Sequence, residues 1–260
     1  LRHARARADE PREPPPLSYA AKTHIMPVLV FAGEGFFQPE DGAIHSFTLA
    51  DGALTPGPVT KQGGTFPMWL APHPSKPVLY TVYSPDGEAE GSVCAYSIGA
   101  DGTLTSVGDR QPVGGAVPCH CEVLDTTLLV ANYVGGTICA VPILEDGSLG
   151  PAGCVVDHGT GAGTHLSGRQ AAAHPHQITA SPDGKFVFVV DLGTNSVVGY
   201  TLATHDRAAC SRTLTRHTEF VVHDSAGPRH MAFSPNAPFA YILNELDNTV
   251  VPVGCKQLTL

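Results

Sequence analysis

Short apolar runs recur along the chain at an interval close to fifty residues. They begin at Val28, Val78, Leu128, Phe186 and Phe239, so that successive starts are 50, 50, 58 and 53 residues apart. Asp-Gly turns return at 51–52, 101–102 and 146–147, at matching places in successive repeats. Runs this short, rich in Val, Phe and Tyr and bounded by Gly and Pro, predict strands rather than helices.

Each repeat is predicted to hold four short strands. In the second repeat they are residues 78–83, residues 92–98, a strand that starts at Leu104 after the Asp101-Gly102 hairpin turn, and residues 118–124, which close the unit. Four strands at a period near fifty are typical of a β-propeller. The sequence therefore predicts an all-β fold of four-stranded antiparallel blades over residues 26–260.

The number of repeats is not a whole number. Residues 28–238 hold four complete repeats, and a fifth begins at Phe239. Propellers close into rings of about 4–8 blades, and a partial blade leaves strand edges exposed. We therefore expect about four to four and a half blades of a longer protein that continues beyond Leu260. The alternative is a four-bladed ring with an additional hairpin.

Composition supports an all-β fold and excludes several partners. Glycine (28) and proline (23) make up a fifth of the 260 residues, which disfavours helical architectures. The net charge of −9 gives no support to nucleic-acid binding. No apolar run approaches the roughly 18–20 residues of a membrane span, so no membrane partner is expected.

The cysteines and the N-terminal segment bear on location. Seven cysteines, an odd number spread along the chain, do not resemble a disulfide framework and favour reduced thiols in the cytoplasm. Cys119-His120-Cys121 is open to two interpretations, metal ligands or alternating residues of a strand, and no second Cys/His pair has zinc-finger spacing. Residues 1–25, rich in Arg and Pro, are expected to be a disordered extension without a secretory signal.

Polar clusters follow the predicted inner strands and supply candidate chemistry. His174 and His176 are two residues apart, so on a strand they share a face, and a histidine there can act as a base or a metal ligand. Arg229 follows a Gly-Pro turn and suits a carboxylate, a phosphate or an oxyanion. Glu245 can orient a histidine, pair with Arg229 or act as an acid or base. The alternative for Arg229 and Glu245 is a purely structural ion pair.

Five strings in order carry a resemblance to a known family. They are A-N-Y-V-G-G (131–136), R-Q-A-A-A-H-P-H (169–176), D-L-G (191–193), G-P-R-H (227–230) and N-E-L (244–246). On these strings the chain resembles the seven-bladed lactonase family, which includes the bacterial-type 6-phosphogluconolactonases and the fungal 3-carboxy-cis,cis-muconate cycloisomerase. One departure is Thr194-Asn195, where the family often has x-Asp after D-L-G.

The resemblance implies a site at the mouth of the propeller channel, with no metal or organic cofactor. It implies that a histidine of the H-x-H string, for which we favour His176, acts there with Arg229 and Glu245. The remaining polar residues of the same strings are candidate substrate contacts: His174, Arg169, Asn132, Asp191 and His230.

The expected reaction is hydrolysis of a sugar-acid lactone, most directly 6-phosphogluconolactone in the pentose phosphate pathway. The alternatives are a muconate-type lactonizing cycloisomerase and a non-catalytic propeller that binds a small molecule.

Overall fold

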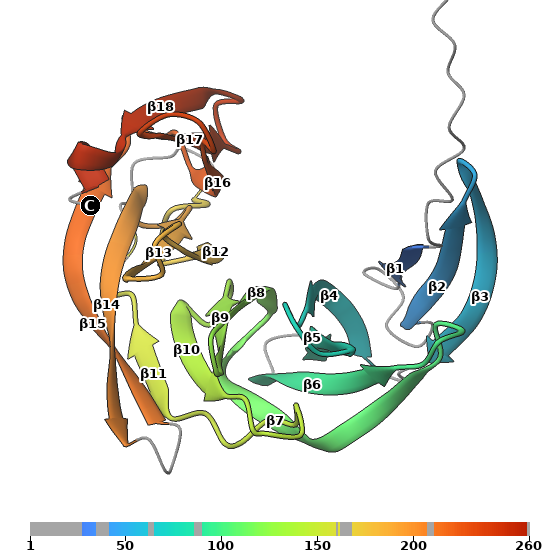
Figure 1. Ribbon diagram of the computed structural model, residues 1–260. Helices are drawn as coiled ribbons and strands as arrows, with labels where there is room; N and C mark the ends of the chain where they lie inside the picture. Colours follow the sequence, from blue (N-terminus) through green and yellow to red (C-terminus); the bar gives the residue numbers. More distant parts are fainter. Residues whose placement is uncertain are drawn as a thin grey trace, which may run out of the picture.

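The fold is an open arc of β-sheets arranged around a common axis (Figure 1). The computed structural model describes residues 28–258 except 35–41, 62–64, 86–89, 160, 162–167 and 207–210. The expected N-terminal extension, residues 1–25, lies outside the described residues. In the described part of the chain, no helix has the length and apolar character needed to cross a membrane.

Three of the sheets have four antiparallel strands in sequence order. They consist of β4 (Thr65–Pro72), β5 (Val78–Pro85), β6 (Glu90–Ile98) and β7 (Leu104–Ala116); β8 (Pro118–Leu124), β9 (Thr127–Asn132), β10 (Thr137–Pro142) and β11 (Cys154–Asp157); and β12 (Pro175–Ala180), β13 (Phe186–Asp191), β14 (Ser196–Asp206) and β15 (Ser211–Val221). These are the predicted propeller blades.

Two sheets of three strands flank the complete blades. They consist of β1 (Val28–Glu34), β2 (Ala43–Ala50) and β3 (Ala53–Lys61), and of β16 (Pro228–Phe233), β17 (Phe239–Asn244) and β18 (Val250–Gly254), which is followed by the short 3-10 helix η2 (Cys255–Leu258). The eighteen strands of the described residues equal four and a half blades in number, as predicted, but they form three complete blades and two three-stranded sheets instead of the four complete units expected over residues 28–238.

The predicted boundary between blades is wrong by one strand. Residues 118–124 were expected to close the second repeat, but β8 pairs with β9 and opens the next sheet. The apolar runs at Val78, Leu128, Phe186 and Phe239 are therefore the second strands of their blades, and the strand that begins near a proline is the first. The strands β4, β8, β12 and β16 line the inside of the arc (Figure 1).

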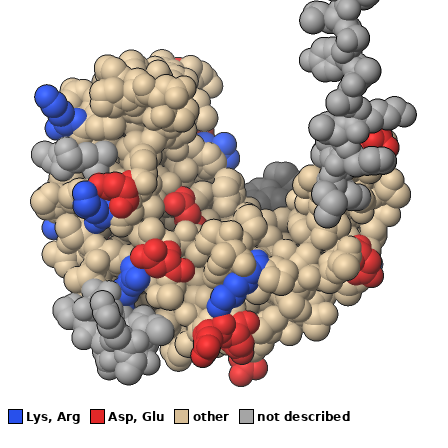
Figure 2. Space-filling model, viewed as in Figure 1, with Lys and Arg blue, Asp and Glu red and all other residues tan. Residues whose placement is uncertain are grey.

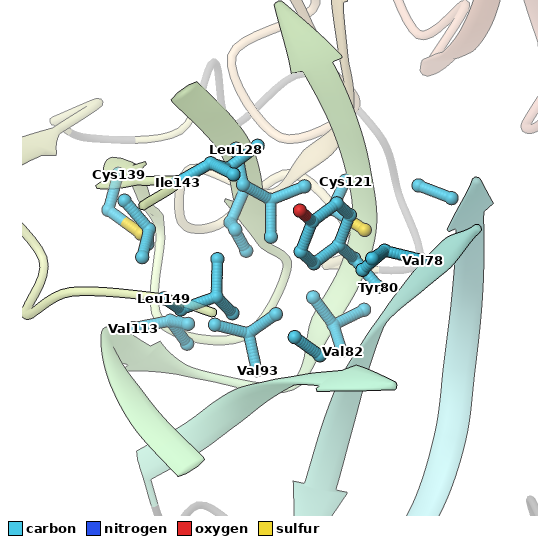
Figure 3. Close-up of a cluster of buried hydrophobic side chains, with 14 residues drawn as sticks. Val78, Tyr80, Val82, Val93, Val113, Cys121, Leu128, Cys139, Ile143 and Leu149 are labelled. Carbon is cyan, nitrogen blue, oxygen red and sulfur yellow. The ribbon is translucent and has the colours of Figure 1, made fainter. Parts of the chain in front are cut away.

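Apolar side chains fill the space between neighbouring blades. Tyr80 and Val82 of β5 belong to the same buried cluster as Leu128 and Val130 of β9, which joins two sheets (Figure 3). Each of these side chains is completely buried, and full burial stabilises the fold by about 1.5–3 kcal/mol per apolar side chain. The Tyr80 hydroxyl donates a hydrogen bond to the carbonyl oxygen of Gly147 at 3.0 Å, so its polar end is satisfied.

The surface carries few charges. On the face shown in Figure 2, acidic and basic side chains lie close to one another, and most of the surface carries neither. This matches a composition in which only 15% of residues are charged. The inner strands, by contrast, bring several charged and aromatic side chains together.

Candidate active site at the inner strands

A proline and a β-bulge shape the start of each inner strand. The pairing of β8, β12 and β16 with the following strand shifts by one residue directly after Pro118, Pro175 and Pro228, and β4 shifts in the same way after Pro67. A bulge turns the extra side chain away from its regular direction. The bulged residues are Met68, Cys119, His176 and Arg229. The repeat therefore places His176 and Arg229 at equivalent positions in adjacent blades.

A second repeated position lies at the end of the next strand. Asn132, Asp191 and Asn244 pair with the three prolines Pro118, Pro175 and Pro228. The residues that directly follow them leave the sheet, and two of these are Tyr133 and Glu245. The backbone N–H of Glu245 donates to the carbonyl oxygen of Gly227 at 2.8 Å. This bond fixes Glu245 beside the Gly-Pro-Arg turn, so residues 16 positions apart in sequence become neighbours.

Glu245 is the centre of the cluster. Its Oε1 accepts a hydrogen bond from Nη2 of Arg169 at 2.7 Å, and its Oε2 lies 3.1 Å from Nε of Arg229. Nε2 of His176 lies 3.8 Å from the same Oε2. The carboxylate is 30% exposed and both guanidinium groups are more than 40% exposed, so the cluster is accessible to a small molecule.

His176 is held as a neutral imidazole whose acceptor nitrogen faces Arg229. Nε of Arg229 donates to Nε2 of His176 at 3.1 Å, which places the ring proton on Nδ1. Burial of the ring and then the charge of Arg229 lower the pKa of His176 to about 4. The side chain is only 14% exposed. At neutral pH, Nε2 of His176 can therefore accept a proton once the Nε–H of Arg229 is directed at Oε2 of Glu245, which lies 3.1 Å from the same Nε.

Arg169 reaches the cluster from a turn in front of β12. The backbone N–H of Ala171 donates to the carbonyl oxygen of Gly168, which closes this turn. Nη2 of Arg169 also donates to the Tyr133 hydroxyl at 2.9 Å, and its bonds to Tyr133 and Glu245 raise the pKa of Arg169. With two guanidinium groups, one carboxylate and a neutral His176, the cluster carries a net charge of +1. An anionic ligand is favoured there.

The structure brings four of the eight predicted site residues into direct contact: Arg169, His176, Arg229 and Glu245. His230 lies beside them, its ring centroid 5.3 Å from that of His176, and burial lowers its pKa. His174 stacks on Tyr133 at 4.6 Å, and its Nδ1 donates to the Tyr133 carbonyl oxygen.

The two remaining predicted contacts, Asn132 and Asp191, are fully buried inside their blades. Nδ2 of Asn132 donates to the carbonyl oxygen of Val113 and to the Thr137 hydroxyl. The Asp191 carboxylate accepts hydrogen bonds from the backbone of His174 and from Nδ1 of His158. Both side chains thus bind protein groups: the partners of Asn132 lie in β7 and β10, and one partner of Asp191 is the backbone just before β12.

Two aromatic residues beside the cluster, Tyr133 and Trp69, were not among the predicted site residues. Tyr133 lies 5.2 Å from His176, and Trp69 packs against His120 at 4.2 Å and His230 at 5.9 Å. Trp69, His120 and His230 each directly follow a bulge in different blades, so the repeat register is the signal that relates them.

The Cys119-His120-Cys121 segment forms alternating positions of β8. Sγ of Cys119 donates to the carbonyl oxygen of His176 at 3.3 Å, and burial raises the pKa of its thiol to about 12. Cys121 packs in the apolar cluster between blades, and the His120 ring packs against Trp69 with the two ring planes tilted by 39°. Among the described residues, no three His, Cys, Asp or Glu side chains are arranged to hold a metal ion.

Fold and site together define a β-propeller with a cationic cluster, centred on one glutamate, at its inner strands. The model of the family described as Lactonase, 7-bladed beta-propeller matches residues 35–259, and the chain belongs to this family.

Individual relatives agree with the family assignment. The chain is 35% identical over 188 residues to the 6-phosphogluconolactonase of Bacillus subtilis, covering 71% of this chain and 50% of that protein. Among solved structures, a Bacteroides fragilis protein assigned provisionally as a 6-phosphogluconolactonase superposes with a TM-score of 0.80 at 27% identity, covering 90% of this chain and 65% of the other. The periplasmic gluconolactonase of Pseudomonas aeruginosa superposes with a TM-score of 0.73 at 25% identity, covering 88% and 64%. The chain therefore spans about half the length of the curated relative.

Proposed function

We propose that the cluster of His176, Arg229, Glu245 and Arg169 hydrolyses the lactone of a sugar acid, most directly 6-phosphogluconolactone. The observation that carries the proposal is the neutral His176, whose basic Nε2 lies 3.1 Å from one arginine and 3.8 Å from the central glutamate. A base beside an exposed cation is the arrangement that water addition to a carbonyl requires.

The first step is addition of water to the lactone carbonyl carbon. The Nε–H of Arg229 turns to Oε2 of Glu245, which frees Nε2 of His176. His176 then takes a proton from the attacking water through Nε2, a C–O bond forms, and the carbonyl oxygen becomes an oxyanion. In the described part of the chain, the hydrogen bonds of Arg229 to protein groups use Nε alone, so its Nη groups are available to this oxyanion. The developing negative charge offsets the guanidinium, and this raises the pKa of His176 while the proton is transferred.

The second step opens the ring. The tetrahedral intermediate collapses, the bond between the former carbonyl carbon and the ring oxygen breaks, and protonated His176 returns its proton to that oxygen. The product is a hydroxy acid, and His176 is again neutral. Glu245 contacts both guanidinium groups and thereby holds the cations in place during both steps. Arg169 is the proposed partner of the substrate's phosphate, because a guanidinium binds phosphate through paired N–H donors.

The proposal includes a place in the cell and in metabolism. The six cysteines of the described part of the chain are all free, which supports a reducing compartment such as the cytoplasm. Hydrolysis of 6-phosphogluconolactone there belongs to the pentose phosphate pathway. Cell fractionation tests this location, and recovery of the protein outside the cytoplasm would contradict it.

A substrate comparison tests the proposed reaction. The chain is assayed with 6-phosphogluconolactone, with unphosphorylated gluconolactone and with 3-carboxy-cis,cis-muconate. We expect hydrolysis of the phosphorylated lactone well above the spontaneous rate. Arg169→Met should raise KM for the phosphorylated lactone more than for the unphosphorylated one.

Each other outcome has a definite meaning. Turnover of the unphosphorylated lactone alone would refute the phosphate assignment. Lactonization of the muconate alone would favour the cycloisomerase. Absence of turnover with all three compounds would refute an enzyme and favour a binding module.

A further inference from the structure

One buried amide joins the separate segments that carry the two arginines. Asn195 lies in the turn between β13 and β14, is 2% exposed, and is absent from the cluster around Glu245. Its Oδ1 accepts a hydrogen bond from Nε2 of Gln170 at 2.9 Å and another from the backbone N–H of Gly227 at 3.0 Å. Gln170 directly follows Arg169, and Gly227 begins the turn that carries Arg229.

The amide nitrogen of Asn195 also makes both hydrogen bonds that it can donate. Nδ2 of Asn195 donates to the carbonyl oxygens of Val222 at 3.2 Å and His223 at 2.8 Å. An asparagine side chain can accept two hydrogen bonds and donate two, and here all four are made. The orientation of the amide is therefore fixed by its partners.

The backbone of Asn195 has an unusual conformation that suits this residue. Its φ angle is 59°, in the left-handed region that asparagine adopts more readily than most residues. Gln170 is itself completely buried, and its Nε2 also donates to the carbonyl oxygen of Leu192 at 2.9 Å. The turn at 192–195 thus makes two hydrogen bonds to Gln170, beside Arg169, and one to Gly227, before Arg229.

We propose that Asn195 is a positioning residue that sets the spacing of Arg169 and Arg229 on either side of Glu245. The two guanidinium groups meet different oxygens of the same carboxylate, so displacement of either segment separates one of them from Glu245. This inference concerns the same site as the proposed function and rests on it for its catalytic consequence. Its structural consequence, the fixed place of Arg229, is measurable without turnover.

The experiment compares Asn195→Gly with a matched control in the wild-type chain. Glycine adopts the φ angle of 59° without strain and removes only the side-chain hydrogen bonds. The control is Ser181→Ala, which removes a buried hydroxyl that accepts from the backbone N–H of Phe186 and donates to Asp183. Ser181 follows β12 at the end away from His176, so its loss tests buried hydrogen bonding alone.

The first readout is the NMR signal of the Arg229 Nε–H, identified by its absence in Arg229→Lys. This proton lies between Nε2 of His176 and Oε2 of Glu245, so we expect slow exchange with water in the wild type and in Ser181→Ala. In Asn195→Gly the signal should broaden or exchange rapidly. An unchanged signal in Asn195→Gly would overturn the proposal, whether or not the chain is a lactonase.

The second readout is lactonase activity. Misplacement of a site group by about 1 Å costs on the order of 100-fold in rate, so kcat/KM of Asn195→Gly should fall at least about tenfold while Ser181→Ala stays within about twofold. Should Asn195→Gly fail to fold, Gln170→Leu cuts the link to Arg169 alone. It should lower kcat/KM and leave the Arg229 signal intact, and wild-type kcat/KM in Gln170→Leu would overturn the proposal.

Discussion

Replacing Arg229 by methionine tests the electrostatic account of His176. Nε of Arg229 lies 3.1 Å from Nε2 of His176, and its side chain is 44% exposed, so water screens the interaction strongly. At a dielectric constant near 80, a unit charge at that distance destabilises the protonated imidazole by about 1.3 kcal/mol. This free energy lowers the pKa of the imidazole by about one unit. We therefore expect Arg229→Met to raise the pKa of His176 from about 4 to about 5.

The value should not return to that of a free histidine, because burial is the larger cause of the low pKa and remains in the variant. The assay is an NMR titration of the His176 imidazole, which requires no turnover. Arg169→Met is the matched control: it removes the same charge, but the pKa of His176 is not set by Arg169 and should change little. An unchanged pKa in Arg229→Met, or a value near 6.5, would refute the reasoning.

Glu245, two buried histidines and Gly227 each support a further measurable expectation. Glu245→Gln removes the charge that pairs with both arginines, so kcat/KM should fall by about 100-fold or more, with little change in Tm because these pairs are exposed; wild-type kinetics would contradict the role. The pKa values of His176 and His120, about 4 and about 3, lie below the unfolded value of 6.5. The unfolded chain therefore binds more protons, and stability should fall as the pH drops below 6.5 until about pH 3. Urea unfolding at pH 7 and pH 4.5 measures this, and equal midpoints would contradict it. In Gly227→Ala, a methyl group would lie 2.4 Å from Cγ of Leu246 at a φ of 62°, so unfolding free energy should fall by about 1–3 kcal/mol. Unchanged urea midpoints would refute that strain.

The repeat of short apolar runs was enough to predict the propeller. The predicted blade boundary was wrong because strand pairing is a long-range property. The sequence of a strand such as β8 is compatible with pairing either to β7 before it or to β9 after it. The prolines that begin the inner strands held the missing information. Since proline lacks an N–H for the ladder, it is placed at strand starts and bulges, which is where Pro118, Pro175 and Pro228 lie.

The site was predictable where position in the repeat fixes the side chain. His176 and Arg229 follow equivalent prolines in adjacent blades. Glu245 follows β17, the strand that pairs with the strand of Arg229, so the three side chains lie close together. The contact between Tyr133 and Arg169 could not be predicted from the sequence, because it joins a turn to another blade. Nor did the sequence indicate that Asn195, noted only as a lost charge, binds two segments through one oxygen.

His176 is the proposed base of a lactone-hydrolysing site, and every step of the proposed reaction depends on it. The most direct measurement is the rate of 6-phosphogluconate formation from 6-phosphogluconolactone by the wild-type chain and by His176→Asn, each corrected for spontaneous hydrolysis. We expect clear acceleration by the wild type and a loss of at least about 100-fold in the variant, with its Tm preserved. Equal rates for the two proteins, or no acceleration by the wild type, would contradict this role of His176.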